Sequence, residues 1–366
     1  MKQDAYSFRG VMTLTSPMHV ADMAAGHYDE QTHRFLDSGD RENAKRTRFM
    51  PIVDQNSPHG NTVRVPYFPS NDFRGRLRRK AAWLIFEKLI ERGDHLSLGA
   101  FHGMTCGSVT GRPAKGSAYS LAEDSAVRND LWMALFGGGP KIHQSGLRTH
   151  DLLPVCEVTI NAGMVPPVQP ALNGDIRDIT YGISSVKKDD VFLMHDPRLG
   201  KLLGNYREAV TAWSEAVAMG AMERKKAKGE KKAGSQKDSE DTKESIVRLD
   251  TIYVTEAIAP GTPLYVRVDL APYLDGRHVG LIAASLADLT NENALGGLVS
   301  KGFGHFTWAS IDLYHGERVL HRNAIRAESG TWTPSVDLKP FITELEAAVD
   351  SIKTKDIEGF FSEEAA

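Results

Sequence analysis

The sequence predicts an α+β fold with a ferredoxin-like (RRM-like) core, and three observations carry this prediction. Apolar residues recur at helical spacing over 71–92 and again over 276–291. Strand-like stretches lie before, between and after these two segments. Without its insertions the chain therefore reads strand, helix, strand, strand, helix, strand, which is the split β-α-β order that also underlies RNA-recognition modules. With 366 residues and 41% apolar content, it can bury one large core with insertions or two modest domains, and we expect a single domain, 1–366.

The first half of the core begins with a strand at about 5–15. A long polar insertion, 16–63, separates this strand from the first helix. That helix is expected over 71–92, with Ser70 or Asn71 as its N-cap. Its apolar positions are 73, 77, 81, 84, 85 and 89.

Two further insertions interrupt the core. The first, 93–146, is rich in Gly and Ser and contains a short helix near 123–136. A strand is predicted at about 147–160, directly after it. The second insertion, 161–248, contains a helix near 203–222 with apolar residues at 203, 206, 210, 213 and 217.

The rest of the chain completes the core. A charged stretch at about 220–245 has too few apolar residues to bury a core and is expected to be a mobile tip. Two strands, 250–258 and 263–271, are predicted to form a hairpin that turns at Ala259-Pro-Gly-Thr262. The helix 276–291 then leads through a glycine-rich segment to a last strand at about 304–314.

Charge and composition narrow the class of protein. The formal net charge is −3, and eight acids against three bases lie in the tail 337–366, which is expected to be helical. A basic groove elsewhere is compatible with this distribution, because local charge matters more than the total. The two cysteines, Cys106 and Cys156, suit a reducing cytoplasm. No run approaches the roughly 20 apolar residues of a membrane span, and the start lacks a signal peptide's apolar region, so we expect a cytoplasmic protein without membrane contact.

The glycine-rich segment 295–306 is the first candidate binding element. It reads Leu-Gly-Gly-Leu-Val-Ser-Lys-Gly-Phe-Gly-His-Phe. Successive N–H groups in glycine turns form anion-binding nests, and the cation and aromatics suit a phosphate with its base or sugar. A glycine turn that only joins helix to strand is the structural alternative. The candidate contacts are Gly296, Gly297, Lys301, Gly302, Phe303 and Gly304.

The start of the helix 71–92 is the second candidate binding element. Five Lys or Arg residues lie within 74–80. Cations in a first turn oppose the helix dipole at about 0.3 to 1 kcal/mol each, so they call for an anionic partner. On a helical wheel Arg74 and Arg78 fall beside the apolar stripe, whereas Arg76, Arg79 and Lys80 lie opposite. We therefore expect Arg74 and Arg78, with Ser70 and Asn71, to contact nucleic acid, and a solvated basic face is the alternative.

Together with the first strand, these segments resemble the RAMP superfamily of CRISPR proteins. The family pattern is a strand that ends near a His, a helix start of the form P-x-(S/N)-x-(L/F)-(R/K)-G and a C-terminal glycine loop. Here Phe8–Val20, Pro69–Gly75 and the glycine-rich segment match it in order. Within the superfamily the chain looks like the repeated backbone subunit. The insertion pattern and Phe136-Gly-Gly-Gly139 are most similar to its type IV form.

The resemblance implies a non-catalytic subunit that binds CRISPR guide RNA and repeats head-to-tail along it, as the helical filament of an effector ribonucleoprotein in antiviral or anti-plasmid defence. The guide would pair with target nucleic acid, so the protein would read backbone shape. Implied partners are further copies, a handle-capping RAMP subunit, a large subunit, a guide-processing ribonuclease and, in one branch, a helicase. A thumb is also implied, for which 161–248 is the candidate, with Arg177, Tyr181, Lys187 and Lys188 facing RNA.

Signals for chemistry are weak. Asp22, Asp29, Asp37 and Asp40 follow the first strand, where type III relatives carry a catalytic aspartate, but none lies in that motif. His19, at the end of the strand, is expected to contact RNA or to make a structural hydrogen bond. No paired metal-ligand spacing and no Walker ending occur, so we expect no catalysis, metal or cofactor. A metal-dependent endoribonuclease of the same fold and a guide-processing ribonuclease remain the alternatives.

Overall fold

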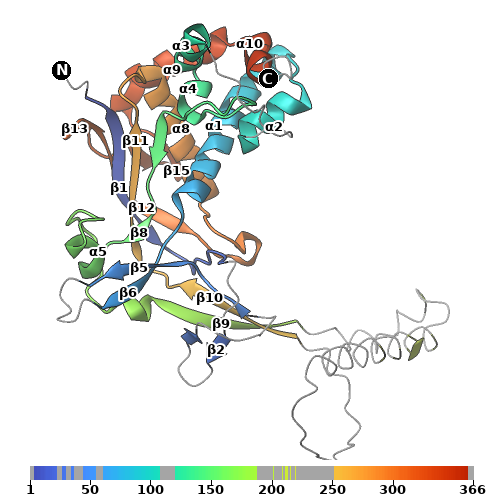
Figure 1. Cartoon of the computed structure of the whole chain (residues 1–366), viewed down its shortest axis with the longest axis vertical. Helices are drawn as coiled ribbons and strands as arrows, with labels where there is room; N and C mark the ends of the chain where they lie inside the picture. The colour runs from blue at the N-terminus through green and yellow to red at the C-terminus, as the bar shows by residue number, and fades with distance from the viewer. Residues whose placement is uncertain are drawn as a thin grey trace, which may run out of the picture.

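The computed structural model describes residues 4–361 except 23–26, 30–33, 37–43, 55–60, 108–119 and most of 188–250. A twisted antiparallel sheet forms its centre, in the order β13-β12-β1-β11-β7, with β8 also paired to β11 (Figure 1). These strands are β1 (Tyr6–Leu14), β7 (Leu147–Thr149), β8 (Leu153–Pro154), β11 (Pro263–Leu270), β12 (Phe306–His315) and β13 (Arg318–His321).

The sheet order identifies the architecture. The two central strands, β1 and β11, are antiparallel neighbours, and β12 and β7 flank them. Along the chain these strands alternate with α1 (Ser70–Arg92) and α8 (Gly276–Glu292) in the order β1, α1, β7, β11, α8, β12. The α+β prediction is therefore confirmed, and the strand order is that of the split β-α-β unit.

The two long helices close the core over one face of the sheet. On α1 the buried positions Phe73, Leu77, Ala81, Ile85 and Leu89 recur every four residues, as the periodicity indicated. The helix ends at Arg92, where Gly93 takes the left-handed conformation with φ of 74°. Its start differs from the prediction because Pro69 occupies the N-cap position.

Two strand predictions are wrong. The stretch 147–160 is not one strand: after β7 and β8 it becomes the helix α5 (Glu157–Asn161). The hairpin of 250–258 with 263–271 is also wrong, since β10 (Thr251–Ile258) pairs along its whole length with β9 (Thr180–Lys187). Alternating apolar residues indicate that a segment is a strand, but they do not select its partner.

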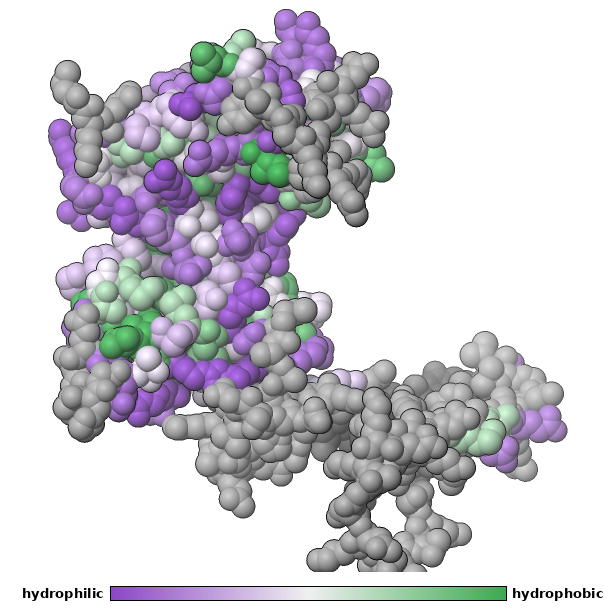
Figure 2. Space-filling model, viewed as in Figure 1, coloured by the Kyte–Doolittle hydropathy of each residue, from purple (hydrophilic) through white to green (hydrophobic). Residues whose placement is uncertain are grey.

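The ribbon of β9 and β10 leaves the core on the side away from the helices and carries β4 (Ala44–Lys45) on its other edge, as a second sheet. Mostly hydrophilic side chains surround the narrowing between this sheet and the helix-covered core (Figure 2). The insertion after β1 adds two hairpins, which are formed by β2 (His27–Asp29) with β3 (Arg34–Leu36) and by β5 (Phe49–Val53) with β6 (Thr62–Pro66).

The predicted helix 123–136 is broken in two. α3 (Leu121–Asn129) ends before Asp130, and α4 (Met133–Phe136) begins after it. The Asp130 carboxylate is the cause, because its Oδ1 accepts the N–H groups of Trp132 and Met133 at 2.9 and 2.6 Å. The same insertion contains α2 (Leu98–Cys106). Beyond the last predicted strand, β14 (Ile325–Glu328) and β15 (Thr331–Pro334) form an additional hairpin.

The acidic tail packs on the core as α9 (Lys339–Ser351) and α10 (Thr354–Phe361). Its buried side chains are Leu345, Val349, Ile357 and Phe361. The Phe361 ring fills the notch at Gly103 of α2, where an added Cβ would overlap it.

Two predictions fall largely or wholly outside the described residues: the helix 203–222, of which only isolated helical positions are described, and the tip at 220–245. Within the described ranges, no helix is both long and apolar enough to cross a lipid bilayer.

Candidate nucleic-acid interface

Three segments that are far apart in the sequence meet at one cleft of about 400 Å³. They are the chain just after β1, the first three turns of α1 and the glycine-rich segment. The strand, helix start and glycine loop that resemble the RAMP pattern thus share one site, which we call the loop cleft. Its lining consists of Val20, Ala21, Phe68, Asn71, Asp72, Gly75, Arg76, Arg79, Gly296 and Gly297.

The end of the first strand holds the glycine loop in place. The carbonyl oxygens of Pro17 and His19 accept the N–H groups of Gly304 and Gly297 at 2.7 and 2.8 Å. The approach requires glycine: an added Cβ at Gly296 would lie 2.5 Å from the His19 oxygen, and its φ of +85° is left-handed.

The side chain of His19 is buried, with an exposed fraction of 3%. Its Nδ1–H donates to the carbonyl oxygen of Glu256 at 2.8 Å, and burial lowers the pKa of the ring. The structure therefore shows the structural hydrogen bond that was one of the two expectations for this ring, and the RNA contact stays a prediction.

The amides of the glycine loop are used mainly inside the protein. Lys301 N–H donates to Leu298 O, and Gly302 N–H donates to Val299 O, at 2.8 and 2.9 Å. Together with the Gly297 and Gly304 bonds to His19 and Pro17, these contacts give four amides of the loop partners within the protein, and anion binding by the remaining groups stays a prediction. Gly296 and Gly297 line the loop cleft. The other four predicted contacts, Lys301, Gly302, Phe303 and Gly304, lie outside its lining.

The helix contributes one stripe of side chains to the cleft. Asp72, Arg76 and Arg79 are four and three residues apart and therefore lie on one face of α1. The Arg76 guanidinium reaches the Gly296 carbonyl oxygen at 3.4 Å, and Arg79 is exposed. Asn71, the one predicted helix contact in the cleft, is also exposed. Two arginines against one carboxylate, at a helix N-terminus, favour an anion.

The arginines that the helical wheel favoured point elsewhere. Arg74 and Arg78 both donate through Nη2 to the carbonyl oxygen of Phe136, at 2.6 and 2.9 Å. Arg78 also donates to the Cys106 oxygen at 3.1 Å, and burial is the main reason that its pKa falls to about 10. These guanidinium groups therefore tie α1 to the Phe-Gly-Gly-Gly segment and not to the loop cleft.

Ser70 likewise lies outside the cleft lining, and its backbone has structural partners. The Ser70 N–H donates to Asp151 Oδ1 at 2.7 Å, and the Ser70 oxygen accepts from Thr149 Oγ1 at 3.0 Å. A carboxylate from the next strand region thus replaces the expected side-chain cap.

Sequence reasoning missed Arg76 and Arg79. Their helical spacing places them opposite the apolar positions of α1, where the sequence alone predicts a solvated face. Lys80, on the same side, ion-pairs with Asp288 of α8 at 3.0 Å. The side of α1 that carries Arg76 and Arg79 faces a cleft because α8 and the glycine-rich segment pack beside it, which only the structure shows.

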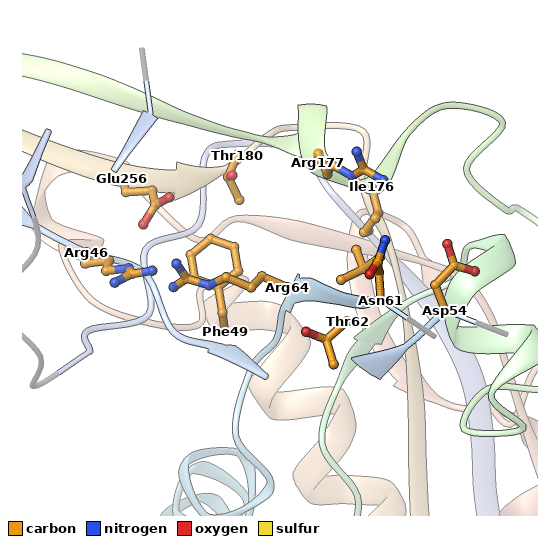
Figure 3. A pocket seen from close by; sticks show the side chains of 11 residues that line it. Arg46, Phe49, Asp54, Asn61, Thr62, Arg64, Ile176, Arg177, Thr180 and Glu256 are labelled. Carbon is orange, nitrogen blue, oxygen red and sulfur yellow. The ribbon is translucent and has the colours of Figure 1, made fainter. Parts of the chain in front are cut away.

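A second pocket, of about 580 Å³, lies where the β5–β6 hairpin meets the second sheet (Figure 3). We call it the thumb-base pocket. Its lining consists of Arg46, Phe49, Asp54, Asn61, Thr62, Val63, Arg64, Ile176, Arg177, Thr180 and Glu256. The Arg64 guanidinium lies over the Phe49 ring, 4.7 Å from its centroid.

Glu256 is the unusual group of the thumb-base pocket. It is 5% exposed, and its Oε2 accepts the Thr47 N–H at 3.0 Å. Burial raises the pKa of this carboxyl to about 7. No sequence motif predicts this residue, because its raised pKa is caused by burial in the tertiary structure.

The structure describes the side chains of two of the four predicted thumb contacts. Arg177 lines the thumb-base pocket, with 60% of its side chain exposed. Tyr181 stands on β9 with an exposed fraction of 37%. The side chain of Lys187 and the whole of Lys188 lie outside the described residues.

Among the described residues, no group of three or more His, Cys, Asp or Glu side chains could hold a metal ion. Of the four aspartates considered for catalysis, Asp22 is described, and its N–H donates to the Arg46 oxygen at 3.0 Å. The side chain of Asp29 and the whole of Asp37 and Asp40 lie outside the described part.

Comparison with solved structures finds chains of similar structure. The chain is similar to a chain of a solved structure titled "Type IV-B CRISPR Complex", with 14% sequence identity and a TM-score of 0.46. The similarity covers 91% of this chain and 96% of that one. At this identity and TM-score it assigns no function. No protein-family model and no curated protein matches the sequence.

Replacing Arg78 by Ala should lower the free energy of unfolding by about 2 kcal/mol, because two carbonyl oxygens lose a charged donor in a half-buried site. Urea denaturation followed by circular dichroism measures it. Arg79→Ala, on the exposed side of the same helix, is the matched control and should cost less than about 0.5 kcal/mol. Equal costs for the two variants would contradict the structural role of Arg78.

Glu256→Gln should change how stability depends on pH. In the folded protein the pKa is about 7, above the usual 4.5, so ionisation disfavours folding and wild-type stability falls as pH rises from about 4.5 through 7. The glutamine does not titrate, so the variant should gain up to about 3 kcal/mol relative to wild type between pH 5 and pH 8. Denaturation at pH 5, 6, 7 and 8, with Glu87→Gln on the exposed face of α1 as control, measures this gain. A stability difference that is constant with pH would refute the assignment.

Proposed function

We propose that this protein is a non-catalytic RNA-binding subunit that holds the guide RNA of a type IV-like CRISPR effector complex. The loop cleft is the observation that carries the proposal. It brings together the strand end, the helix start and the glycine loop, which are the three segments that resemble the RAMP pattern. Segments separated by more than two hundred residues would not need to meet if each were only a local turn or cap.

The chemistry of the cleft suits an RNA backbone. Arg76 and Arg79 supply positive charge beside the N-terminus of α1, and Asn71 supplies an amide. Groups of this kind bind phosphates and sugars, which fix the position of a strand without reading its sequence. Specificity would then belong to the guide, which pairs with target nucleic acid.

The ribbon of β9 and β10 supports assembly into a filament. It extends away from the core and offers one surface, while the loop cleft and its surroundings offer a different one (Figure 1). Contacts between two different surfaces repeat head-to-tail and build open filaments. The proposal includes further copies of this chain, a handle-capping RAMP subunit, a large subunit, a guide-processing ribonuclease and, in one branch, a helicase as partners, in the cytoplasm.

Replacing both Arg76 and Arg79 by Ala should weaken binding of a spacer-length RNA by more than about tenfold at 0.1 M salt. The salt slope should fall by about 1.4, because each lost phosphate contact on a single strand accounts for about 0.7. Fluorescence anisotropy over a salt series measures both quantities. The matched control is Lys88→Ala with Lys353→Ala, which removes one charge near the far end of α1 and one in the tail, between α9 and α10. An unchanged slope in the arginine variant would exclude the cleft as a phosphate site.

Protein purified from cells that express a CRISPR array should form large particles containing spacer RNA that is protected at a regular interval. Light scattering and sequencing of the bound RNA measure this, and the same sample incubated with Mg²⁺ or Mn²⁺ tests for cleavage. Intact RNA is expected. Metal-dependent cleavage that is lost in aspartate variants at positions 22, 29, 37 and 40 would favour the endoribonuclease, and cutting of a repeat hairpin would favour the guide-processing enzyme.

A further inference from the structure

We propose that the thumb-base pocket binds one unstacked guanine nucleotide, with its base beside Phe49 and Arg64, its Watson–Crick edge on Glu256 and its phosphate on Arg177. The inference rests on the proposed RNA-binding function and adds to it a preference for one base. It concerns a site separate from the loop cleft, since the two linings share no residue.

The size and shape of the pocket suit a nucleotide. Its volume of about 580 Å³ falls within the range of small-molecule sites. Figure 3 shows Phe49, Arg64 and Glu256 toward one end of the pocket and Arg177 toward the other, with Thr62 and Thr180 between them. The lining thus offers a flat apolar surface and a carboxylate at one end and a cation at the other.

The stacking surface is already assembled. The Arg64 guanidinium lies 4.7 Å from the centroid of the Phe49 ring, and that of Arg46 lies 5.7 Å from it. Aromatic rings and guanidinium planes are the surfaces on which proteins stack unpaired bases. Such stacking accepts any base, so it gives affinity without discrimination.

Glu256 supplies the discrimination. A carboxylate is an acceptor only, and in the described part of the chain Oε2 accepts the Thr47 N–H. Guanine presents two adjacent donors, N1–H and the N2 amino group, which match the two oxygens of a carboxylate. Cytosine and adenine place an acceptor beside their single amino group, and uracil has its one N–H between two carbonyl oxygens. A buried carboxylate left facing such acceptors would lose favourable contacts, which is the basis of strong discrimination.

Arg177 supplies the phosphate contact. Its side chain is 60% exposed, and Nε lies 3.5 Å from Asp175 Oδ1, a long contact that leaves the guanidinium open to another anion. Asp54 and Asn61 line the same end of the pocket. Since Asp54 disfavours an anion, Arg177 itself must provide the attraction.

The two sites share a wall, so one RNA strand can reach both. Val20, which lines the loop cleft, donates its N–H to Thr47 Oγ1 at 3.1 Å. Thr47 in turn donates its N–H to Glu256, which lines the thumb-base pocket. A strand held in the cleft by its phosphates could therefore place one nucleotide across this wall.

Calorimetric titration of the full-length protein with GMP, AMP, CMP and UMP at pH 8 tests the proposal. GMP should bind at least about tenfold more tightly than the other three, as expected for a paired donor contact. Glu256→Gln should abolish this preference. Arg177→Ala, an exposed change, should weaken GMP but not guanosine. Equal affinities for the four nucleotides, no binding of GMP at millimolar concentration, or a preference that survives in Glu256→Gln would each overturn it.

A second titration distinguishes a nucleotide within an RNA strand from a free nucleotide. It also tests the guanine site independently of the proposed RNA-binding function. Oligouridine RNA with one central guanosine should bind more tightly than oligouridine alone, and Glu256→Gln should remove the difference. The Arg76→Ala, Arg79→Ala variant should bind GMP as wild type does while binding both oligonucleotides weakly. GMP selectivity without RNA binding would refute the strand nucleotide and the proposed function together and would leave a free-nucleotide site. RNA binding without GMP selectivity would refute only the guanine site.

Discussion

The junction at His19 is the constraint on which both sites depend. Its carbonyl oxygen accepts the Gly297 N–H, and its ring donates to the Glu256 backbone. One residue at the end of the first strand thus joins the glycine loop of the core to the second sheet. The ring is buried, and this burial lowers its pKa and so disfavours a charge at the junction. Neighbouring bonds reinforce the junction, since Met18 pairs with Ile258 and the Pro17 oxygen accepts the Gly304 N–H, so the segment 17–19 positions the loop and the second sheet together.

Local sequence pattern predicted the elements better than their partners. Periodicity placed α1 and α8 correctly because a helix that buries one face must repeat every three or four residues. The same reasoning failed for 147–160, where apolar residues continue from two short strands into α5, and for β10, whose partner is β9 and not the adjacent β11. Pairing is decided by tertiary packing, which alternation along one strand does not encode.

The charged residues of the candidate site also depend on tertiary packing that the sequence does not encode. Composition revealed that five cations crowd the start of α1, but it did not reveal which of them are neutralised within the fold. Arg74 and Arg78 donate to the Phe136 carbonyl oxygen, and Lys80 forms an ion pair with Asp288 of α8. Arg76 and Arg79 are the two that line the loop cleft. Glu256 lay beyond sequence reasoning altogether. A glutamate in a strand becomes a group with a raised pKa only when the hairpin β5–β6 and the end of the first strand close over it.

The ribbon of β9 and β10 pairs residue by residue from Thr180 opposite Ile258 to Lys187 opposite Thr251. Side chains along such a ribbon alternate between its two faces. Whether each strand has an even or an odd number of residues therefore decides which face a given end of the ribbon presents. Lengthening both strands by two residues would move the far end outward and keep the same face toward a neighbour. Lengthening them by one would turn the opposite face toward it. Evolution along this ribbon is therefore free to change reach only in steps of two residues per strand, if the surface presented to the next molecule is to stay the same.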